Sequence, residues 1–266
     1  MDTIKVNGIS VTDHGGSGEP LIFIHAYPLC NRMWDNQVSY FKDKYRVITY
    51  DIRGLGYSND IESYLFTMED LVDDLENILD HLKINKVHAC GLSVGGYILL
   101  RAAVRMPERF LSLILSDTKA DDDDYEGLLG RSAAIKNIRS GKKDEFTNAM
   151  LPKLISEKSI ENTELTSKLD EIMGWMDADG MCAVMIAIAT RTNLSYRIKE
   201  IDIPSLVIVG KDDVLTPVIK SFYLKEGIKN SAYHLIIDAG HLSNMEKPEE
   251  FNLAVNNFLD SNEQIF

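Results

Sequence analysis

The chain has 266 residues, 45% of them hydrophobic, and a formal net charge of −13 at pH 7. This size and composition indicate a globular protein with one large domain and an insertion, and the negative charge argues against nucleic acid or an anionic membrane as a partner. Three widely spaced cysteines, Cys30, Cys90 and Cys182, predict reduced thiols in a cytoplasmic protein rather than a disulfide framework or a zinc site. The N-terminal residues lack a signal-peptide pattern, and no run approaches the roughly 18 apolar residues that span a bilayer.

The first half of the sequence alternates between strand and helix patterns. Residues 4–6 and 9–12, joined by Asn7-Gly8, predict a hairpin. Apolar strands and amphipathic helices then alternate from residue 21 to residue 116, which predicts a mainly parallel sheet. Thr67 and Asp70 predict a capping box at the start of a helix that ends near Leu82.

The strand pattern stops after Asp117 and resumes at Ser205, which predicts a helical insertion. Helical stretches are expected at residues 124–140, 143–154, 164–176 and 180–190. We therefore expect an α/β core formed by residues 1–118 and 195–266, with a helical cap formed by residues 119–194. The aspartate run at 121–124 is interpreted as a solvated linker or a helix N-terminus, because four adjacent carboxylates lack the ligand spacing of a calcium site.

The segment Gly91-Leu92-Ser93-Val94-Gly95 has the pattern G-x-S-x-G. It follows a strand-like run at 87–90 and precedes a helical pattern at 96–104, which is the context of a nucleophile elbow. In such an elbow the serine lies at a strained turn, and side chains in place of the flanking glycines would clash with the strand and the helix. We therefore predict that Ser93 is a nucleophile, and a serine nucleophile needs a base to remove its proton.

His241 and Asp213 are the predicted partners of Ser93. Each follows a strand-like run, and loops at the carboxyl ends of strands carry the chemistry in open α/β sheets. An aspartate in such a loop can accept the imidazole N–H and stabilise the imidazolium. By position alone, Asp212 and Asp117 are alternative acids, because Asp212 is adjacent in sequence and Asp117 follows another strand.

Five segments of the chain carry a resemblance to a known family. They are residues 21–34 (LIFIHAYPLCNRMW), 50–58 (YDIRGLGYS), 91–95 (GLSVG), 210–217 (GKDDVLTP) and 240–248 (GHLSNMEKP). In these segments the chain resembles the α/β-hydrolase superfamily, and above all its small bacterial esterases, its lactonases of the 3-oxoadipate enol-lactonase kind and its cofactor-free perhydrolases. The resemblance implies an α/β-hydrolase fold, with a mostly parallel eight-stranded sheet flanked by helices and an inserted helical cap. The family's G-x-x-D-x-x-T-P pattern implies Asp213 as the acid.

The resemblance also implies an oxyanion hole made of two backbone N–H groups, those of Val94 and Tyr27. Most members of the family have His-Gly where this chain has His25-Ala26. If this position needs a positive φ, alanine costs on the order of 1 kcal/mol relative to glycine, and otherwise the change has no effect. Pro28 follows, and a proline here is either a simple loop stiffener or a feature of perhydrolase-like relatives.

Several residues near these motifs are interpreted as structural. His25 is expected to brace the oxyanion loop by hydrogen bonding, and His88 to be a core histidine with satisfied hydrogen bonds. Asp51 and Arg53 lie on one glycine-rich turn, and we expect them to pair with each other as a brace.

The cap is rich in methionine, which suits an adaptable apolar pocket over Ser93 or the packing of the cap onto the core. The residues predicted to line a substrate pocket are Leu29, Trp34, Trp175, Met176, Met185 and Leu215.

Together these features predict a serine hydrolase that cleaves a carboxylic ester or lactone through an acyl-enzyme. Ser93 attacks the carbonyl, His241 transfers protons, and Asp213 stabilises the imidazolium. No metal and no organic cofactor is expected, the partner is a small-molecule ester or lactone, and a homodimer is left open. The alternatives on the same fold are a cofactor-free perhydrolase, a carbon–carbon bond hydrolase and a low-turnover ligand sensor.

Overall fold

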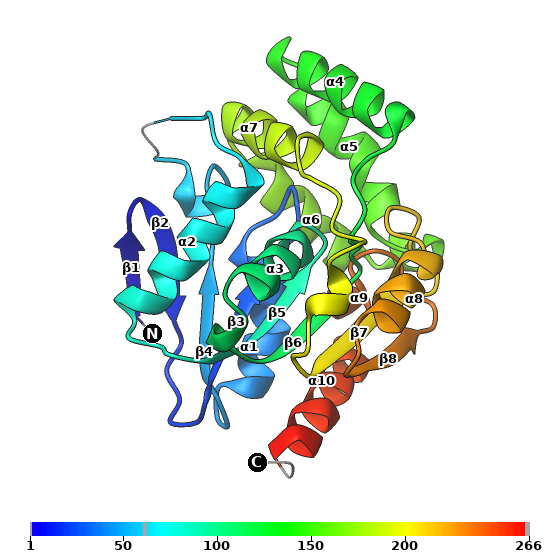
Figure 1. Ribbon diagram of the computed structural model, residues 1–266. Coiled ribbons are helices and arrows are strands. Elements are labelled where there is room, and N and C mark those ends of the chain that lie inside the picture. Colours follow the sequence, from blue (N-terminus) through cyan, green and yellow to red (C-terminus); the bar gives the residue numbers. More distant parts are fainter. Residues whose placement is uncertain (1, 61–62, 264–266) are drawn as a thin grey trace.

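A mixed β-sheet forms the centre of the molecule (Figure 1). The computed structural model describes residues 2–60 and 63–263. Within them the sheet has eight strands in the order β1-β2-β4-β3-β5-β6-β7-β8. The strands are β1 (Asp2–Val6), β2 (Ile9–Asp13), β3 (Pro20–Ile24), β4 (Arg46–Tyr50), β5 (Val87–Leu92), β6 (Phe110–Ser116), β7 (Ser205–Gly210) and β8 (Ser231–Ile236).

The sheet begins with antiparallel pairs and continues with parallel ones. β1 pairs with β2 and β2 with β4 in antiparallel fashion, and the pairs from β4 to β8 are parallel. Asn7 and Gly8 have φ values of 49° and 85°, which a two-residue hairpin turn requires, so the predicted hairpin is confirmed. β5 and β7 are buried along their whole length, as expected for parallel strands covered on both faces. The expected mostly parallel, eight-stranded sheet is confirmed.

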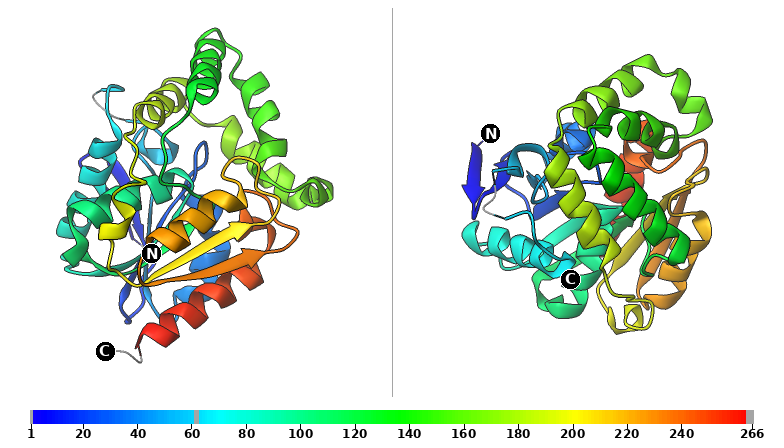
Figure 2. Two further views of the ribbon diagram at one scale, coloured as in Figure 1. Left: turned by 45° about the vertical axis from the view of Figure 1, so that its right-hand side comes forward. Right: turned by 90° about the horizontal axis from the view of Figure 1, so that it is seen from above.

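Helices cover both faces of the sheet (Figures 1 and 2). On one face lie α2 (Met68–His81), α3 (Val94–Arg105) and α8 (Val218–Gly227), and on the other lie α1 (Asp35–Phe41) and α10 (Pro248–Glu263). The predicted capping box begins α2, where the Thr67 N–H donates to the Asp70 carboxylate at 2.7 Å. The short helices are α9 (Ser243–Glu246) and the 3₁₀ turns η1 (Asn31–Trp34), η2 (Gly56–Ser58), η3 (Pro107–Arg109), η4 (Glu157–Glu161) and η5 (Ile198–Glu200).

Four helices between β6 and β7 lie above the carboxyl ends of the parallel strands (Figures 1 and 2). They are α4 (Tyr125–Arg139), α5 (Lys143–Leu154), α6 (Thr163–Gly174) and α7 (Ala178–Ala189), and they confirm the four helices expected in this segment. No single helix in the described residues is long and apolar enough to cross a membrane. α6 and α7 pass that test as a pair, by length and composition alone, with a bend of 96° between them.

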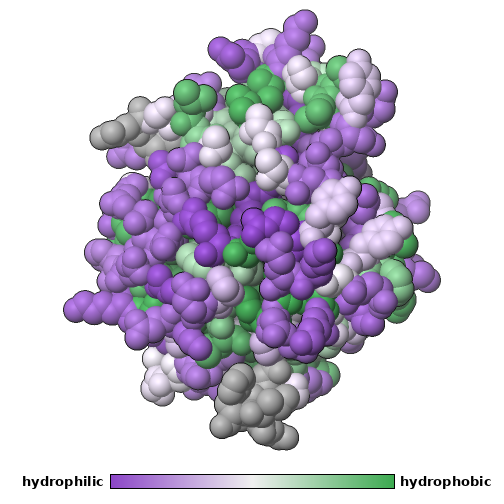
Figure 3. Space-filling model, viewed as in Figure 1, coloured by the Kyte–Doolittle hydropathy of each residue, from purple (hydrophilic) through white to green (hydrophobic). Residues whose placement is uncertain are grey.

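The face seen in Figure 3 is mostly hydrophilic, with apolar side chains on the cap and also among the polar ones below it. Leu128 and Leu129 of α4 are exposed apolar residues of the cap. The apolar residues of the sheet and of the helices that cover it form one buried cluster, which continues into α6 and α7 of the cap. The cap therefore shares its hydrophobic core with the sheet beneath it.

Candidate active site

Ser93 lies at a sharp turn between β5 and α3. Its φ and ψ are 56° and −113°, a combination that non-glycine residues rarely adopt without strain. A Cβ on Gly91 would lie 2.5 Å from the carbonyl carbon of Gly95, and one on Gly95 would lie 2.3 Å from the carbonyl oxygen of Ile24. The glycines on both sides of Ser93 are therefore needed because backbone segments approach closely, as the elbow pattern predicts.

His241 and Asp213 meet in a buried hydrogen bond. His241 Nδ1 lies 2.8 Å from Asp213 Oδ2, and only 1% of the histidine is exposed. The same carboxylate accepts from Thr216 Oγ1 at 2.6 Å and from the N–H groups of Leu215 and Thr216 at 2.8 and 2.9 Å. Because the carboxylate can only accept, Nδ1 carries the proton and Nε2 keeps the lone pair that a general base needs.

The two groups stabilise each other's charged forms. Burial disfavours the imidazolium of His241, but the attraction and hydrogen bond of Asp213 outweigh it, and the pKa of His241 is raised above its ordinary value of 6.5. Burial also disfavours the Asp213 carboxylate, but its interactions with His241 and Thr216 are stronger, and the pKa of Asp213 is lowered. The pair therefore consists of a carboxylate and an imidazole that is ready to take up a proton.

Asp117, the alternative acid, lies beside this pair and is bonded to other groups. Its Oδ1 accepts the Gly210 N–H at 2.8 Å, and its Oδ2 accepts the hydroxyls of Ser116 and Ser243 at 2.7 and 2.5 Å. Burial and the negative charge of Asp213 raise the pKa of Asp117 to about 7. Of the candidate acids, Asp213 is the one that contacts the imidazole.

Backbone contacts bring the elbow to the same edge of the sheet as His241. The Ser93 N–H donates to the Ser116 carbonyl at 3.0 Å, and Ser116 Oγ lies 3.5 Å from the hydroxyl of Ser243, two residues past His241. Among residues 2–60 and 63–263, no hydrogen bond joins the Ser93 hydroxyl to the imidazole. Such bonds are often long before a substrate binds.

The two N–H groups predicted to form an oxyanion hole belong to neighbouring segments, because the Ile24 carbonyl at the end of β3 lies against Gly95 in α3. In the part of the chain that the structure describes, neither the Tyr27 nor the Val94 N–H donates to another protein group. The φ of Ala26 is not positive, so alanine carries no left-handed penalty here. The peptide bond from Tyr27 to Pro28 is cis.

Comparison with known proteins agrees with this architecture. Residues 19–248 match the family described as alpha/beta hydrolase fold. This chain belongs to the α/β-hydrolase family, and it is a hydrolase.

Relatives within the family extend over nearly the whole chain. It is similar to 3-oxoadipate enol-lactonase 1 of Acinetobacter baylyi, with 30% identity over 95% of this chain and 93% of that protein. Among solved structures it resembles a thermophilic esterase from Thermogutta terrifontis, with 28% identity, a TM-score of 0.92 and coverage of 98% of this chain and 99% of that one. It also resembles the enol-lactonase from Burkholderia xenovorans, with 26% identity, a TM-score of 0.89 and coverage of 97% and 100%.

The two histidines interpreted as structural in this hydrolase are satisfied by buried hydrogen bonds. His25 Nδ1 donates to the Ala26 carbonyl at 2.9 Å, and its Nε2 accepts the Ile52 N–H at 2.8 Å. Burial lowers the pKa of His25 to about 4, so the ring is neutral and braces the loop after β3. His88 bonds to the Ser112 hydroxyl at 2.8 Å and to Glu19 at 2.9 Å. Both interpretations are confirmed.

The expected pair of Asp51 and Arg53 is wrong. Asp51 accepts the N–H groups of Asn31 and Tyr57 at 2.7 and 2.8 Å, so it braces the turn through the backbone. Arg53 instead forms a bidentate salt bridge with Asp74 of α2, in which Nε donates to Oδ2 at 2.9 Å. Arg53 thus ties the turn to α2, and Asp51 ties it to η1 and to its own backbone.

The predicted pocket residues fall into different environments. Trp34 is fully buried between Phe23 and Phe251, with ring centroids 4.9 and 6.1 Å away, so it packs in the core between β3 and α10, and its contact with a substrate stays a prediction. Trp175 is 36% exposed and lies 5.2 Å from the ring of Tyr57 at the surface. The other candidates are buried or half-buried, and their contact with a substrate stays a prediction; they are Leu29, Met176, Met185 and Leu215.

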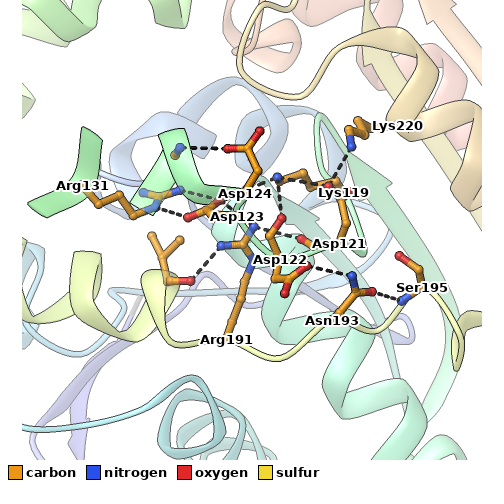
Figure 4. A network of polar contacts seen from close by, with 12 residues as sticks. Lys119, Asp121, Asp122, Asp123, Asp124, Arg131, Arg191, Asn193, Ser195 and Lys220 are labelled. Carbon is orange, nitrogen blue, oxygen red and sulfur yellow. Dashed lines mark hydrogen bonds and ion pairs between the residues drawn. The ribbon is translucent and has the colours of Figure 1, made fainter. Parts of the chain in front are cut away.

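The sequence did not predict a network of charged side chains at the base of the cap. Figure 4 shows Asp123 between Arg131 and Arg191. The carboxylate bonds to both guanidinium groups, at 2.9 Å for Arg191, and Arg191 also donates to the Asp121 carbonyl at 2.9 Å. Burial opposes the charge of Asp123, but the two arginines hold its pKa well below its usual range. Asp123 is therefore buried and paired, not part of a solvated linker.

The other three aspartates of the run also form hydrogen bonds or ion pairs. Asp121 bonds to Lys220 of α8 at 2.7 Å, Asp122 accepts from Asn193 at 2.7 Å, and Asp124 caps α4 by accepting the Gly127 N–H at 2.8 Å. The expectation of a helix N-terminus is confirmed for Asp124 alone. The described residues contain no group of three or more His, Cys, Asp or Glu side chains placed to hold a metal ion.

Proposed function

We propose that this protein hydrolyses a carboxylic ester or lactone through an acyl-enzyme on Ser93. The observation that carries the proposal is the buried bond of 2.8 Å between His241 and Asp213, on the sheet edge where the strained elbow presents Ser93. His241 takes the proton of Ser93 as its hydroxyl attacks the carbonyl carbon, and returns it to the leaving alcohol. Water activated by the same imidazole then releases the acid.

Asp213 holds the imidazole with its proton on Nδ1 and stabilises the imidazolium that forms. The N–H groups of Tyr27 and Val94 stabilise the oxyanion, and the fact that neither donates to another group within the described residues supports this role. The similarity to proteins named as enol-lactonases and as an esterase supports an ester or lactone as the substrate class.

The test combines turnover with covalent labelling. We expect purified protein to hydrolyse p-nitrophenyl acetate and a simple lactone, and a fluorophosphonate to add one phosphonyl group at Ser93, located by peptide mass spectrometry. Ser93→Ala should lower kcat by about 10⁵- to 10⁶-fold, whereas Ser17→Ala, at an exposed serine, should leave it unchanged. Wild-type turnover in Ser93→Ala would overturn the proposal. Labelling without turnover would instead favour a ligand sensor, and peroxide-dependent bromination without ester turnover would favour a perhydrolase.

A further inference from the structure

The loop that carries His241 is attached to the cap as well as to the sheet. The Leu242 N–H donates to the carbonyl of Leu154, the last residue of α5, at 2.9 Å. On the other side of His241, a Cβ on Gly240 would lie 2.6 Å from the backbone nitrogen of Ser156. The residues on both sides of the imidazole therefore touch the linker between α5 and η4.

Glu246 joins these two segments with its two carboxylate oxygens. Oε1 accepts the Gly240 N–H at 2.7 Å, and Oε2 accepts the Ser156 N–H at 2.8 Å. Hydrogen bonds to a charged acceptor are stronger than neutral ones, and both donors are backbone groups in buried positions. Glu246 thus bridges the His241 loop and the cap linker with fixed geometry.

We propose that Glu246 is a positioning residue, which clamps the loop of His241 to the α5–η4 linker so that the position of the cap sets the position of the imidazole. The inference rests on the proposed function, because it assigns Glu246 a role in the reaction of Ser93 and His241. A displacement of the linker passes to His241 through Gly240 on one side and Leu242 on the other. Misplacing a catalytic group by about 1 Å can cost about 100-fold in rate.

The cap side of the clamp can be removed at a single hydrogen bond. Ser156 has φ −65° and Ile155 has φ −129° and ψ 160°, values that suit a proline and the residue before it. Ser156→Pro therefore deletes the N–H that Glu246 accepts while keeping backbone angles that proline can adopt, and the ring carbon that replaces the hydrogen also moves the Glu246 carboxylate away from the linker. Ser156→Ala is the reference variant, because it removes the same hydroxyl and keeps the N–H.

We expect Ser156→Pro to have a kcat about 10- to 100-fold below that of Ser156→Ala, with a much smaller change in KM. Glu246→Gln, which keeps the shape but loses one of the two acceptors, should show a similar loss. Glu249→Gln removes a charge from an exposed position three residues along and serves as its control. The negative charge of Glu246 also helps to raise the pKa of His241, so the acid limb of kcat/KM should move to lower pH in Glu246→Gln and stay in place in Glu249→Gln.

Amide hydrogen exchange separates this inference from the proposed function. Gly240 and Leu242 should exchange faster in Ser156→Pro and Glu246→Gln than in their controls, at a temperature where circular dichroism shows all variants folded. If the wild type neither turns over esters nor labels at Ser93, the proposed function fails, and exchange at Gly240 and Leu242 still decides whether the clamp exists. If the wild type is active and Ser156→Pro matches Ser156→Ala in kcat and in exchange, the clamp is wrong.

Discussion

Gly54 and Gly180 touch each other across the boundary between the sheet and the cap. A Cβ on Gly180 would lie 1.8 Å from the carbonyl oxygen of Gly54, and the two backbones are in direct contact. Gly180 lies in the first turn of α7, and Gly54 lies in the turn after β4 with φ +83°. The cap is therefore seated on the core by a contact between two backbones, which leaves no room for a side chain.

This contact predicts opposite effects for two glycine-to-alanine changes in cap helices. Gly180→Ala should lower the free energy of unfolding by about 1–3 kcal/mol, because the overpacking cost exceeds the gain in helix propensity. Gly130→Ala, in the middle of α4 with nothing within 4 Å of the added Cβ, should raise it by about 0.5–1 kcal/mol. Urea denaturation measures the free energy of unfolding of both variants, and an increase in Gly180→Ala would contradict the contact.

The two adjacent aspartates of the acid loop give a second prediction. Asp213→Asn should lower kcat by about 10⁴-fold, because an amide can donate to Nδ1 and so favours the wrong tautomer of His241. Asp212→Asn makes the same change at an exposed neighbour and should keep kcat within about twofold, in keeping with surface changes that perturb little. Steady-state ester kinetics on both variants is the measurement. Equal losses in the two variants would mean that Asp213 is not the acid.

Asp117 makes stability depend on pH. Its pKa rises from an unfolded value of 3.8 to about 7 on folding, so the unfolded chain releases this proton at lower pH than the folded one. The folded state is therefore destabilised by this group as the pH rises from about 4 to about 7. Asparagine does not titrate, so the stability of Asp117→Asn relative to wild type should improve by at least about 1 kcal/mol between pH 4.5 and pH 7.5. Urea unfolding at both pH values checks the sign, and a constant difference would show that Asp117 is ionised throughout.

The base of the cap should be sensitive to the loss of one carboxylate. Asp123→Asn leaves the guanidinium of Arg191, whose side chain is 1% exposed, without its charged partner. We expect a loss of about 3–5 kcal/mol in the free energy of unfolding. Because the pKa of Asp123 is depressed on folding, its contribution is present above about pH 4 and is lost as the pH falls further. Asp122→Asn, at an exposed position of the same run, should change stability by no more than about 0.5 kcal/mol.

The sequence predicts what depends on local patterns. The hairpin at Asn7-Gly8, the capping box at Thr67 and the glycines around Ser93 each follow from a few neighbouring residues, and the structure has all three. His241 and an acid partner become predictable because each follows a strand of one parallel sheet, and the carboxyl ends of parallel strands share an edge. Strand position alone leaves Asp117 and Asp212 as alternatives, and the resemblance to the family's pattern selects Asp213.

The predictions that failed depend on partners at long range. Arg53 could have paired with any of several acids, and only the packing of α2 against the turn selects Asp74. A run of aspartates in sequence suggests a solvated segment, but the folded cap places Arg191, from the C-terminal end of the insertion, against Asp123. No periodicity encodes these choices, because each partner is fixed by tertiary packing.

One backbone hydrogen bond joins the two ends of the helical insertion. The Leu194 N–H donates to the Ala120 carbonyl at 2.9 Å, so the chain leaves the sheet and returns to it at one point. Because the helical segment starts and ends at hydrogen-bonded positions, it can be lengthened, shortened or replaced by that of a relative without altering the spacing of β6 and β7. Recombination at this point would then exchange the helices above the sheet while the strands beneath them are inherited unchanged.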